Sequence, residues 1–342
     1  MIALPGVFRI GYLRLVANDA ALLRFTIILP ISYPMKLHPL LLPSVALAGA
    51  FTIALAQEKK SENWTVAADK IAKIDAALPA KTPAPVGKKH EVLVFTRTAG
   101  FRHGSIPVGV ETMKRLGNKT GLFSVTHSED PAVFEADSLK KYDAVFMLNT
   151  TGDAFGTGDA AVEERLKTNF MEFVKSGKGI VGIHSATDTY KEWKEYGDMM
   201  GGAFVSHPWG SGDTVTVKNL DPKHPVNAAF KGEGLTLKDE IYKFTKDTAS
   251  PKDRRMLLSL DPNGTDMKKD KSDTRSVYPI AWVDTYGKGR VFYCSLGHND
   301  EVYMNPVVVE HYLAGIQYAL GELAADATPQ AVLSGGRGSE LR

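Results

Sequence analysis

The segment "GKGIVGIHSATD" (residues 177–188) decides the fold, because it reads as a buried strand that runs into a sharp turn. Residues 182–186 follow the pattern Gly-x-nucleophile-x-Gly/Ala of a nucleophile elbow, where Ser or Cys normally stands in the middle. Here the middle residue is His184, a poor covalent nucleophile but a good metal ligand or proton carrier. The sequence therefore predicts an elbow that presents an imidazole.

Apolar strands alternate with helical patterns on both sides of this segment. We predict strands at "EVLVFTRT", "FSVTHSED" and "YDAVFMLNT", a helix from about Pro107, and an amphipathic helix from residue 160 with Gly177 at its C-cap. Further strands follow at 213–220 and 256–260, then a hairpin over 278–298 and a last helix over 306–323. Apolar strands separated by helices imply an α/β fold, with a parallel sheet covered on both faces.

The N-terminal region is typical of an exported protein. Residues 35–56 combine a short basic start, an apolar run and the small-x-small ending Ala-Leu-Ala, which is the pattern of a signal peptide. A membrane anchor is the alternative, but the apolar run is shorter than the about 20 residues that a span needs. We predict cleavage after Ala56 and a periplasmic or secreted mature protein that is not stably inserted in the membrane. Residues 1–34 precede a complete signal peptide, so we interpret them as an upstream leader, an artefact of the gene model, with Met35 as the candidate start.

The rest of the chain divides into three parts. Residues 57–89 hold a short helix, within 63–78, and a Pro-rich linker. One domain spans residues 90–322, and the small, polar residues 323–342 predict a disordered tail.

Charge and cysteine content exclude several classes of protein. The chain has a formal net charge of +2, and removing the first 56 residues takes away four basic and one acidic side chain, which leaves −1. Such a body has no electrostatic reason to bind nucleic acid. Cys294 is the single cysteine, so no intramolecular disulfide can form, and its place in an apolar strand predicts a buried side chain. The charge and cysteine content are compatible with a homo-oligomer.

The candidate site follows from the rule that open parallel sheets bind ligands at the carboxyl ends of their strands. Three histidines, His103, His184 and His298, fall just beyond predicted strand ends, and His207 follows shortly after the elbow. Each alone is more typical of a hydrogen-bonded loop residue, but their convergence on one edge favours a functional site. Other polar or aromatic side chains expected at this edge, as substrate-binding groups, are Arg102, Ser105, Asn149, Asp188, Trp209, Tyr242 and Asn299.

A carboxylate completes the predicted chemistry. "LKDEIYKF" reads as one short strand, in which Glu240 and Tyr242 share one face and Asp239 lies on the other. Glu240 is a candidate general base or ligand, and an exposed strand acid is the alternative. One divalent metal at His103, His184, His207 and His298 is also a hypothesis, although the chain has no closely spaced pair of ligands that would indicate it by itself.

At these residues the sequence resembles the ThuA-like family, named for trehalose utilisation. The resemblance covers residues 90–322 and rests on an ordered set of motifs: "VLVFTRTAGFRHGSI", "YDAVFMLN", "FVKSGKGIVGIHSATD", "FVSHP", "HPV", "DEIY" and "YPIAWVDTYGKGRVFYCSLGHND". It implies a class I glutamine amidotransferase-like, flavodoxin-like sandwich with a mostly parallel central sheet. In the amidotransferases the elbow carries a cysteine, which His184 replaces here, so glutamine hydrolysis through a thioester is excluded.

The resemblance also implies a role in carbohydrate catabolism, in which a sugar hydroxyl has been oxidised to a ketone. A ketone acidifies its neighbouring C–H, so His184, Glu240 and His298 are the candidate catalytic residues, as bases or as stabilisers of the enediolate. The expected partner is a small carbohydrate. A non-catalytic carbohydrate-binding or scaffolding module is the alternative, and hydrolysis through Ser185 is a third hypothesis.

Overall fold

The computed structural model describes residues 64–270 and 277–330. The predicted leader (1–34) and signal peptide (35–56) lie outside the described residues. Within the described part of the chain, no helix is both long and apolar enough to cross a membrane.

A nine-stranded sheet forms the centre of the molecule, in the order β2-β1-β3-β4-β11-β10-β9-β6-β7. The strands from β2 to β11 in this order are parallel neighbours. Their bounds are β1 (His90–Phe95), β2 (Phe123–Ser128), β3 (Ala144–Leu148), β4 (Gly179–Ile183) and β11 (Gly289–Cys294). β3 and β4 are buried along their whole length, as strands covered on both faces must be. The α/β class and the parallel sheet predicted from the sequence are confirmed.

The second half of the chain extends this sheet with antiparallel strands. β10 and β11 form the predicted hairpin, which turns between Tyr286 and Gly289. The remaining strands are β10 (Pro279–Tyr286), β9 (Arg255–Leu260), β6 (Thr214–Asn219) and β7 (Leu235–Lys238). A separate two-stranded antiparallel sheet joins β5 (Phe204–Trp209) to β8 (Ile241–Phe244).

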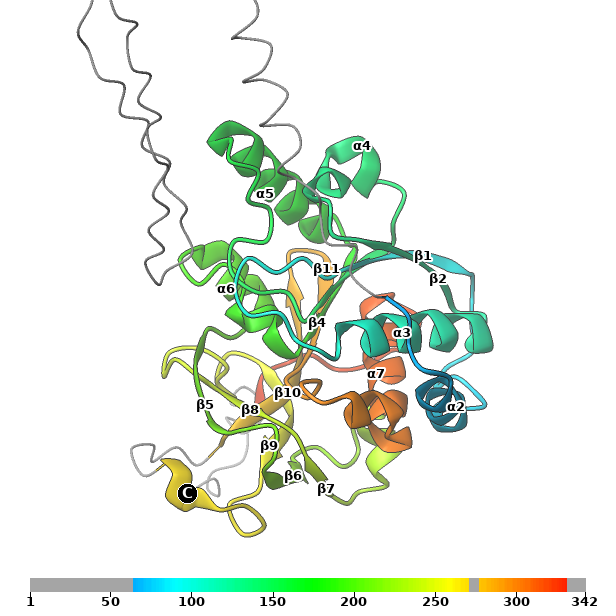
Figure 1. Cartoon of the computed structure of the whole chain (residues 1–342), viewed down its shortest axis with the longest axis vertical. Coiled ribbons are helices and arrows are strands. Elements are labelled where there is room, and N and C mark those ends of the chain that lie inside the picture. Colours follow the sequence, from blue (N-terminus) through cyan, green and yellow to red (C-terminus); the bar gives the residue numbers. More distant parts are fainter. Residues whose placement is uncertain (1–63, 271–276, 331–342) are drawn as a thin grey trace, which may run out of the picture. The chain divides into compact units, whose positions relative to one another are not determined.

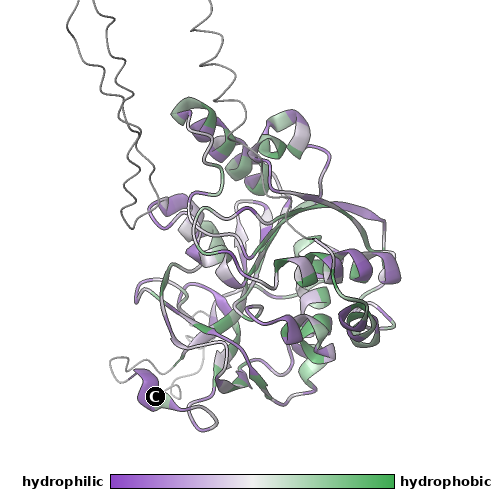
Figure 2. Cartoon of the chain, in the orientation of Figure 1, coloured by the Kyte–Doolittle hydropathy of each residue, from purple (hydrophilic) through white to green (hydrophobic). Residues whose placement is uncertain are grey.

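Helices cover both faces of the sheet, which gives three layers (Figure 1). One face packs against α3 (Ile106–Thr120) and α7 (Pro306–Ala319), and α2 (Ala68–Ala77) lies against these two helices. The other face packs against α5 (Ala160–Lys175) and α6 (Lys194–Met200), and α4 (Ala136–Leu139) lies against α5. Short 3-10 turns complete the chain at η1 (Pro131–Phe134), η2 (His184–Asp188), η3 (Pro225–Phe230), η4 (Met267–Asp270) and η5 (Asp300–Met304). Figure 2 shows mainly apolar central strands and helices with one polar face, the pattern that buries a core on each side.

Local sequence explains where these helices begin and end. The Asp159 carboxylate accepts from two backbone N–H groups at the start of α5, and Gly177 follows its end at φ 117°. Asn305 caps α7 in the same way, with Pro306 in the first turn. Cys294 is fully buried in β11, as predicted.

Two expectations need correction. "LKDEIYKF" is not one strand: β7 ends at Lys238 and β8 begins at Ile241, so Asp239 and Glu240 lie between two strands of different sheets. Residues 323–330, predicted to belong to a disordered tail, also pack on the domain. The Gln330 side-chain amide bonds both the N–H and the carbonyl of Met256. Residues 331–342 lie outside the described residues.

Candidate active site

His184 stands at the tip of a strained turn between β4 and η2. Its φ of 49° lies in the left-handed region that few residues other than glycine adopt. The side chain is fully buried, and its Nδ1–H donates to the carbonyl of Ser295 at 2.7 Å. The Tyr293 hydroxyl donates to the carbonyl of His184 at 2.6 Å, which fixes the turn from below. The predicted elbow is therefore present, and its bonds aim His184 Nε2 at the edge of the sheet.

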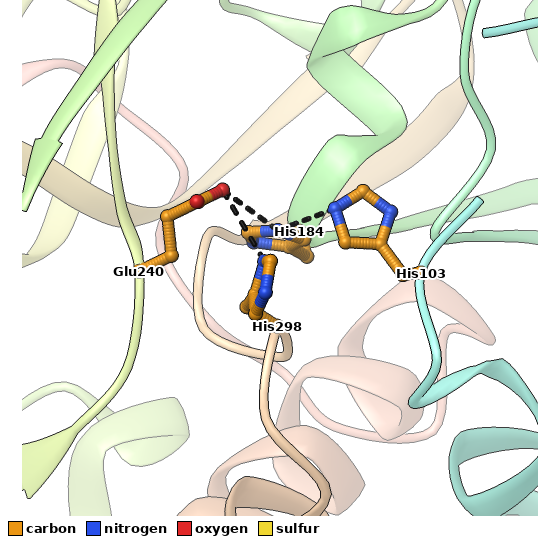
Figure 3. Close-up of side chains that lie close together, drawn as sticks. All are labelled: His103, His184, Glu240 and His298. Carbon is orange, nitrogen blue, oxygen red and sulfur yellow. Dashed lines mark hydrogen bonds and ion pairs between the residues drawn. The ribbon is translucent and has the colours of Figure 1, made fainter. Parts of the chain in front are cut away.

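Three more side chains converge on this nitrogen (Figure 3). His103 lies in the loop between β1 and α3, His298 follows β11, and Glu240 precedes β8. His184 Nε2 is 3.2 Å from His103 Nε2 and 3.6 Å from Glu240 Oε1, and His298 Nδ1 is 3.3 Å from the same oxygen. All four ligand atoms lie within 4.8 Å of one another.

These separations suit one metal ion. With metal–ligand bonds of about 2.0–2.2 Å, tetrahedral coordination separates the ligand atoms by about 3.3–3.6 Å. His298 Nδ1 is buried and has no hydrogen-bond partner among the described residues, although it faces the Glu240 carboxylate. A cation between these groups would bond this nitrogen and the carboxylate oxygen at the same time. The cluster of His103, His184, Glu240 and His298 therefore fits a divalent metal.

The outer ring nitrogens support the same interpretation. Because the Ser295 carbonyl can only accept, His184 carries its proton on Nδ1 and presents a lone pair at Nε2. His103 Nδ1 lies 3.4 Å from the Ser185 hydroxyl, so an Nδ1–H tautomer would free its Nε2 in the same way. Histidine ligands of metals characteristically donate their second N–H to such a partner.

Burial sets the charge of the cluster. Together with the charge of His298, it lowers the pKa of His103 to about 4. Burial likewise holds the pKa of His184 well below its ordinary value. Burial also lowers the pKa of His298, but its contact with Glu240 and the charges of Glu240 and Asp239 outweigh this effect and raise it. Two imidazoles are thus neutral at neutral pH, and the third is the more readily protonated.

Glu240 is oriented by His207, which differs from the role predicted for that histidine. His207 Nδ1 lies 3.1 Å from Glu240 Oε2, the oxygen that faces away from His184, and 53% of its side chain is exposed. It is not part of the four-residue cluster, in which Glu240 takes its place. The reason is the separate β5–β8 sheet. His207 lies on β5, so its ring contacts Glu240 Oε2, whereas His184 and His298 contact Oε1.

Asp239 is a functional residue whose position sequence reasoning missed. Its carboxylate accepts from the backbone N–H groups of Gly297 and Asn299 at 2.8 and 2.9 Å. These residues flank His298 in the chain, so Asp239 fixes the backbone on either side of it. Burial raises its pKa to about 7 despite these two bonds. Its place directly before Glu240 was the available signal, but the expectation of a regular strand turned it to the opposite face.

Ser105 and Asn149, predicted to bind substrate, are buried and bonded within the protein. The Asn149 side-chain N–H donates to Ser105 Oγ at 3.0 Å and to the Gly297 carbonyl at 3.1 Å, and the Tyr303 hydroxyl donates to its oxygen. Ser105 Oγ donates to the same carbonyl at 2.9 Å. Both side chains therefore hold the loop of His298 through the carbonyl of Gly297.

The other predicted substrate-binding residues are more widely spread. The Tyr242 ring lies 4.4 Å from that of His184, and the Asn299 side chain donates to the carbonyls of Ser211 and Lys238. Arg102 pairs with Glu129 beside the cluster, and Asp188 pairs with Lys191. Trp209 is buried in the core, where its indole N–H donates to the Asp266 carbonyl, so it does not line this site.

Comparisons with known proteins agree with this architecture. The model of a family described as ThuA, trehalose utilisation, matches residues 91–319. A ThuA-like protein from Bacteroides uniformis is 24% identical with a TM-score of 0.54, over 69% of this chain and 92% of that one. A ThuA-like protein from Parabacteroides merdae is 19% identical with a TM-score of 0.51, over 70% of this chain and 93% of that one. At these identities the likeness shows the shared fold. No curated protein matches the chain.

Proposed function

The chain belongs to the ThuA family of trehalose utilisation, and on that premise we propose that it is an exported enzyme that abstracts a proton beside the ketone of an oxidised sugar. The observation that carries the proposal is the convergence of His103, His184, His298 and Glu240 within 4.8 Å at the carboxyl ends of the parallel strands. A protein that only binds sugar has no need for several buried imidazoles around one carboxylate.

The residues of the cluster divide into an inner and an outer set. His103 and His184 are buried, whereas His298 is 20% exposed and Glu240 is 8% exposed. A substrate therefore meets His298 and Glu240 first. Phe101, which is 65% exposed, stacks on the His298 ring with 6.4 Å between the ring centroids. An exposed aromatic face beside polar groups suits the apolar face of a sugar ring.

The proposed reaction begins with Glu240 as the base. Its carboxylate takes the proton from the carbon next to the ketone, and the C–H electron pair moves into a new C=C bond while the ketone oxygen gains negative charge. His298, the most readily protonated imidazole of the cluster, stabilises that oxygen. His207 holds the second oxygen of Glu240 and so orients the base. Isomerisation and elimination of a leaving group both start with this step.

A divalent metal would be held by His103, His184 and His298 with Glu240 Oε1. In that state His298 would be a neutral ligand, the cation would take over its role at the ketone oxygen, and Glu240 Oε2 would be the oxygen left to act as the base. When bound, the metal would supply Lewis-acid stabilisation of the developing negative charge. Ser185 and the Ser295 carbonyl would orient the two inner imidazoles through their outer nitrogens.

Proton exchange tests the proposed function directly. The mature chain, incubated with a keto-disaccharide in D₂O, should incorporate deuterium at the carbon beside the ketone, as followed by NMR. Glu240→Gln should slow this exchange by about 10²–10⁴-fold, the usual contribution of a general base. Glu233→Gln, at an exposed position, is the matched control and should exchange like the parent. No exchange by the parent chain, or full exchange by Glu240→Gln, would refute the proposal.

Export is tested separately. Protein purified from its native host should start at Gln57, as found by N-terminal sequencing, if signal peptidase cleaves after Ala56. A mature chain that retains Met35 would contradict the proposed export.

A further inference from the structure

The segment before the family domain contacts the two loops that carry His103 and His298. The family match begins at residue 91, yet the structure describes the chain from residue 64 as part of the same compact unit. Residues 64–70 reach the loop of His103 through Trp64 and the loop of His298 through Lys70. Residues 64–70 themselves lie outside the family match.

Trp64 contacts Arg102, the residue directly before His103, and His127. The guanidinium carbon of Arg102 lies 5.3 Å from the centre of the Trp64 ring, within the range of a cation–π contact. Arg102 also pairs with Glu129 at 2.9 Å, and the Trp64 ring meets the His127 ring edge-on at 4.5 Å. Because Arg102 directly precedes His103 in the chain, the contacts of its side chain restrain the loop that carries that histidine.

Lys70 makes the second contact, beside His298. It lies on α2, and its Nζ pairs with Asp300 Oδ2 at 2.5 Å, with 41% and 20% of the two side chains exposed. Asp300 opens η5 two residues after His298. Asp239 already holds this loop through the N–H groups of Gly297 and Asn299, and Lys70 adds a contact at Asp300.

The segment is itself anchored firmly enough to act as a support. Ile74, Ala77 and Leu78 are buried in the core beneath α2. Asp75 pairs with Arg115 of α3 at 2.8 Å. A helix fixed at its C-terminal end by the core can hold its N-terminal end against these two loops.

We propose that residues 64–70 brace the two loops of the active site, with Trp64 and Lys70 as positioning residues for His103 and His298. The proposal rests on the proposed function for its effect on metal and substrate, but the contacts of the brace can be tested without either. The partly exposed Lys70–Asp300 pair is individually weak, so its loss should loosen the loop without unfolding the domain.

Hydrogen–deuterium exchange and Zn²⁺ titration of the full chain test the brace. Lys70→Met should raise amide exchange in residues 296–301, and Trp64→Ala should raise it in residues 97–105. Each should also weaken Zn²⁺ binding by about three- to tenfold in calorimetry without changing the number of sites, a smaller loss than the about 10–100-fold typical of groups bonded directly to a ligand. Lys70→Arg and Trp64→Phe should restore the parent behaviour.

Lys73→Met is the matched control, because Lys73 lies on the same helix and its ion-pair partner among the described residues is Asp69 of that helix, at 3.6 Å. It should leave both loops and the Zn²⁺ affinity unchanged. Unchanged exchange in both variants would overturn the brace, as would equal loosening by the control. If the variants loosen their loops while the parent binds no Zn²⁺ and exchanges no substrate proton, the brace stands and the proposed function falls.

Discussion

At the scale of the residue, His184 joins an uncommon backbone conformation to an inward-facing imidazole. The left-handed φ of 49° is the position at which an elbow lifts its side chain away from the sheet. Alanine is strained at this φ, whereas asparagine adopts it more readily. The consequences of losing the ring and of straining the backbone can therefore be separated by the choice of substitution.

His184→Asn should lose metal and turnover while keeping the fold. The ring is a proposed ligand at the centre of the cluster, so the metal content of the purified protein, measured by elemental analysis, should fall sharply. The cost in stability should stay within the about 0.5–3 kcal/mol of an ordinary point mutation, as followed by thermal unfolding. His184→Ala should lose the same activity with a larger cost in stability. Full metal content and turnover in His184→Asn would contradict an imidazole-centred site.

Cys294 should play no chemical part. Burial raises the pKa of its thiol to about 12, so the thiolate that a nucleophile or ligand needs is absent at neutral pH. We expect Cys294→Ala to keep full activity and the native thiol to react with a thiol reagent only after unfolding. Rapid labelling of the folded protein, or an inactive variant, would show that the thiol is accessible or used.

At the scale of the element, local patterns predicted the sheet and the elbow, but not the pairing around Glu240. β4 and its turn follow from a short apolar run that ends in Gly-x-His-x-Ala, and every signal lies within ten residues of His184. The position of Glu240 depends on β7 and β8 joining different sheets, which is decided by their partners β6 and β5. Because strand pairing is a tertiary property, alternation within "LKDEIYKF" could not predict it.

Helix α7 offers a pH test. His311 of this helix is fully buried, and its Nδ1–H donates to the Val226 carbonyl at 2.9 Å. Burial lowers its pKa to about 4, below the ordinary value of 6.5. The unfolded chain therefore takes up this proton first, and the stability contributed by neutral His311 is complete above pH 6.5 and is lost as the pH falls through 4.

His311→Asn should accordingly reduce the loss of stability in acid. The amide keeps a donor for the Val226 carbonyl but does not titrate in this range. Between pH 7 and pH 4 the free energy of unfolding of the parent should fall by about 3 kcal/mol more than that of the variant, since each pKa unit is worth about 1.4 kcal/mol. Urea unfolding at several pH values measures both slopes. Identical slopes would show that His311 is not held neutral.

At the scale of the whole molecule, one histidine ties the start of the domain to its end. His90 opens β1, and its Nδ1 lies 3.1 Å from Asp143 Oδ2 while its Nε2 lies 2.7 Å from Glu322 Oε1. Glu322 follows α7, so the first strand and the last helix meet through a single buried ring. His90 and Glu322 thus join two segments far apart in the chain, and composition alone gave no sign that these segments touch.

His90→Leu should destabilise the domain without changing the reaction. Leucine keeps most of the buried volume but removes both bonds, and the two carboxylates retain other partners in Lys178 and the Gly87 N–H, so we expect a loss of about 1–3 kcal/mol. Urea unfolding measures this loss, and His207→Leu, at an exposed position, should cost less than about 0.5 kcal/mol. Because β1 runs from His90 toward the loop of His103, the two lie at opposite ends of the strand. Turnover of the folded variant should therefore equal that of the parent, and an unchanged urea midpoint would show that the two ends are joined by packing alone.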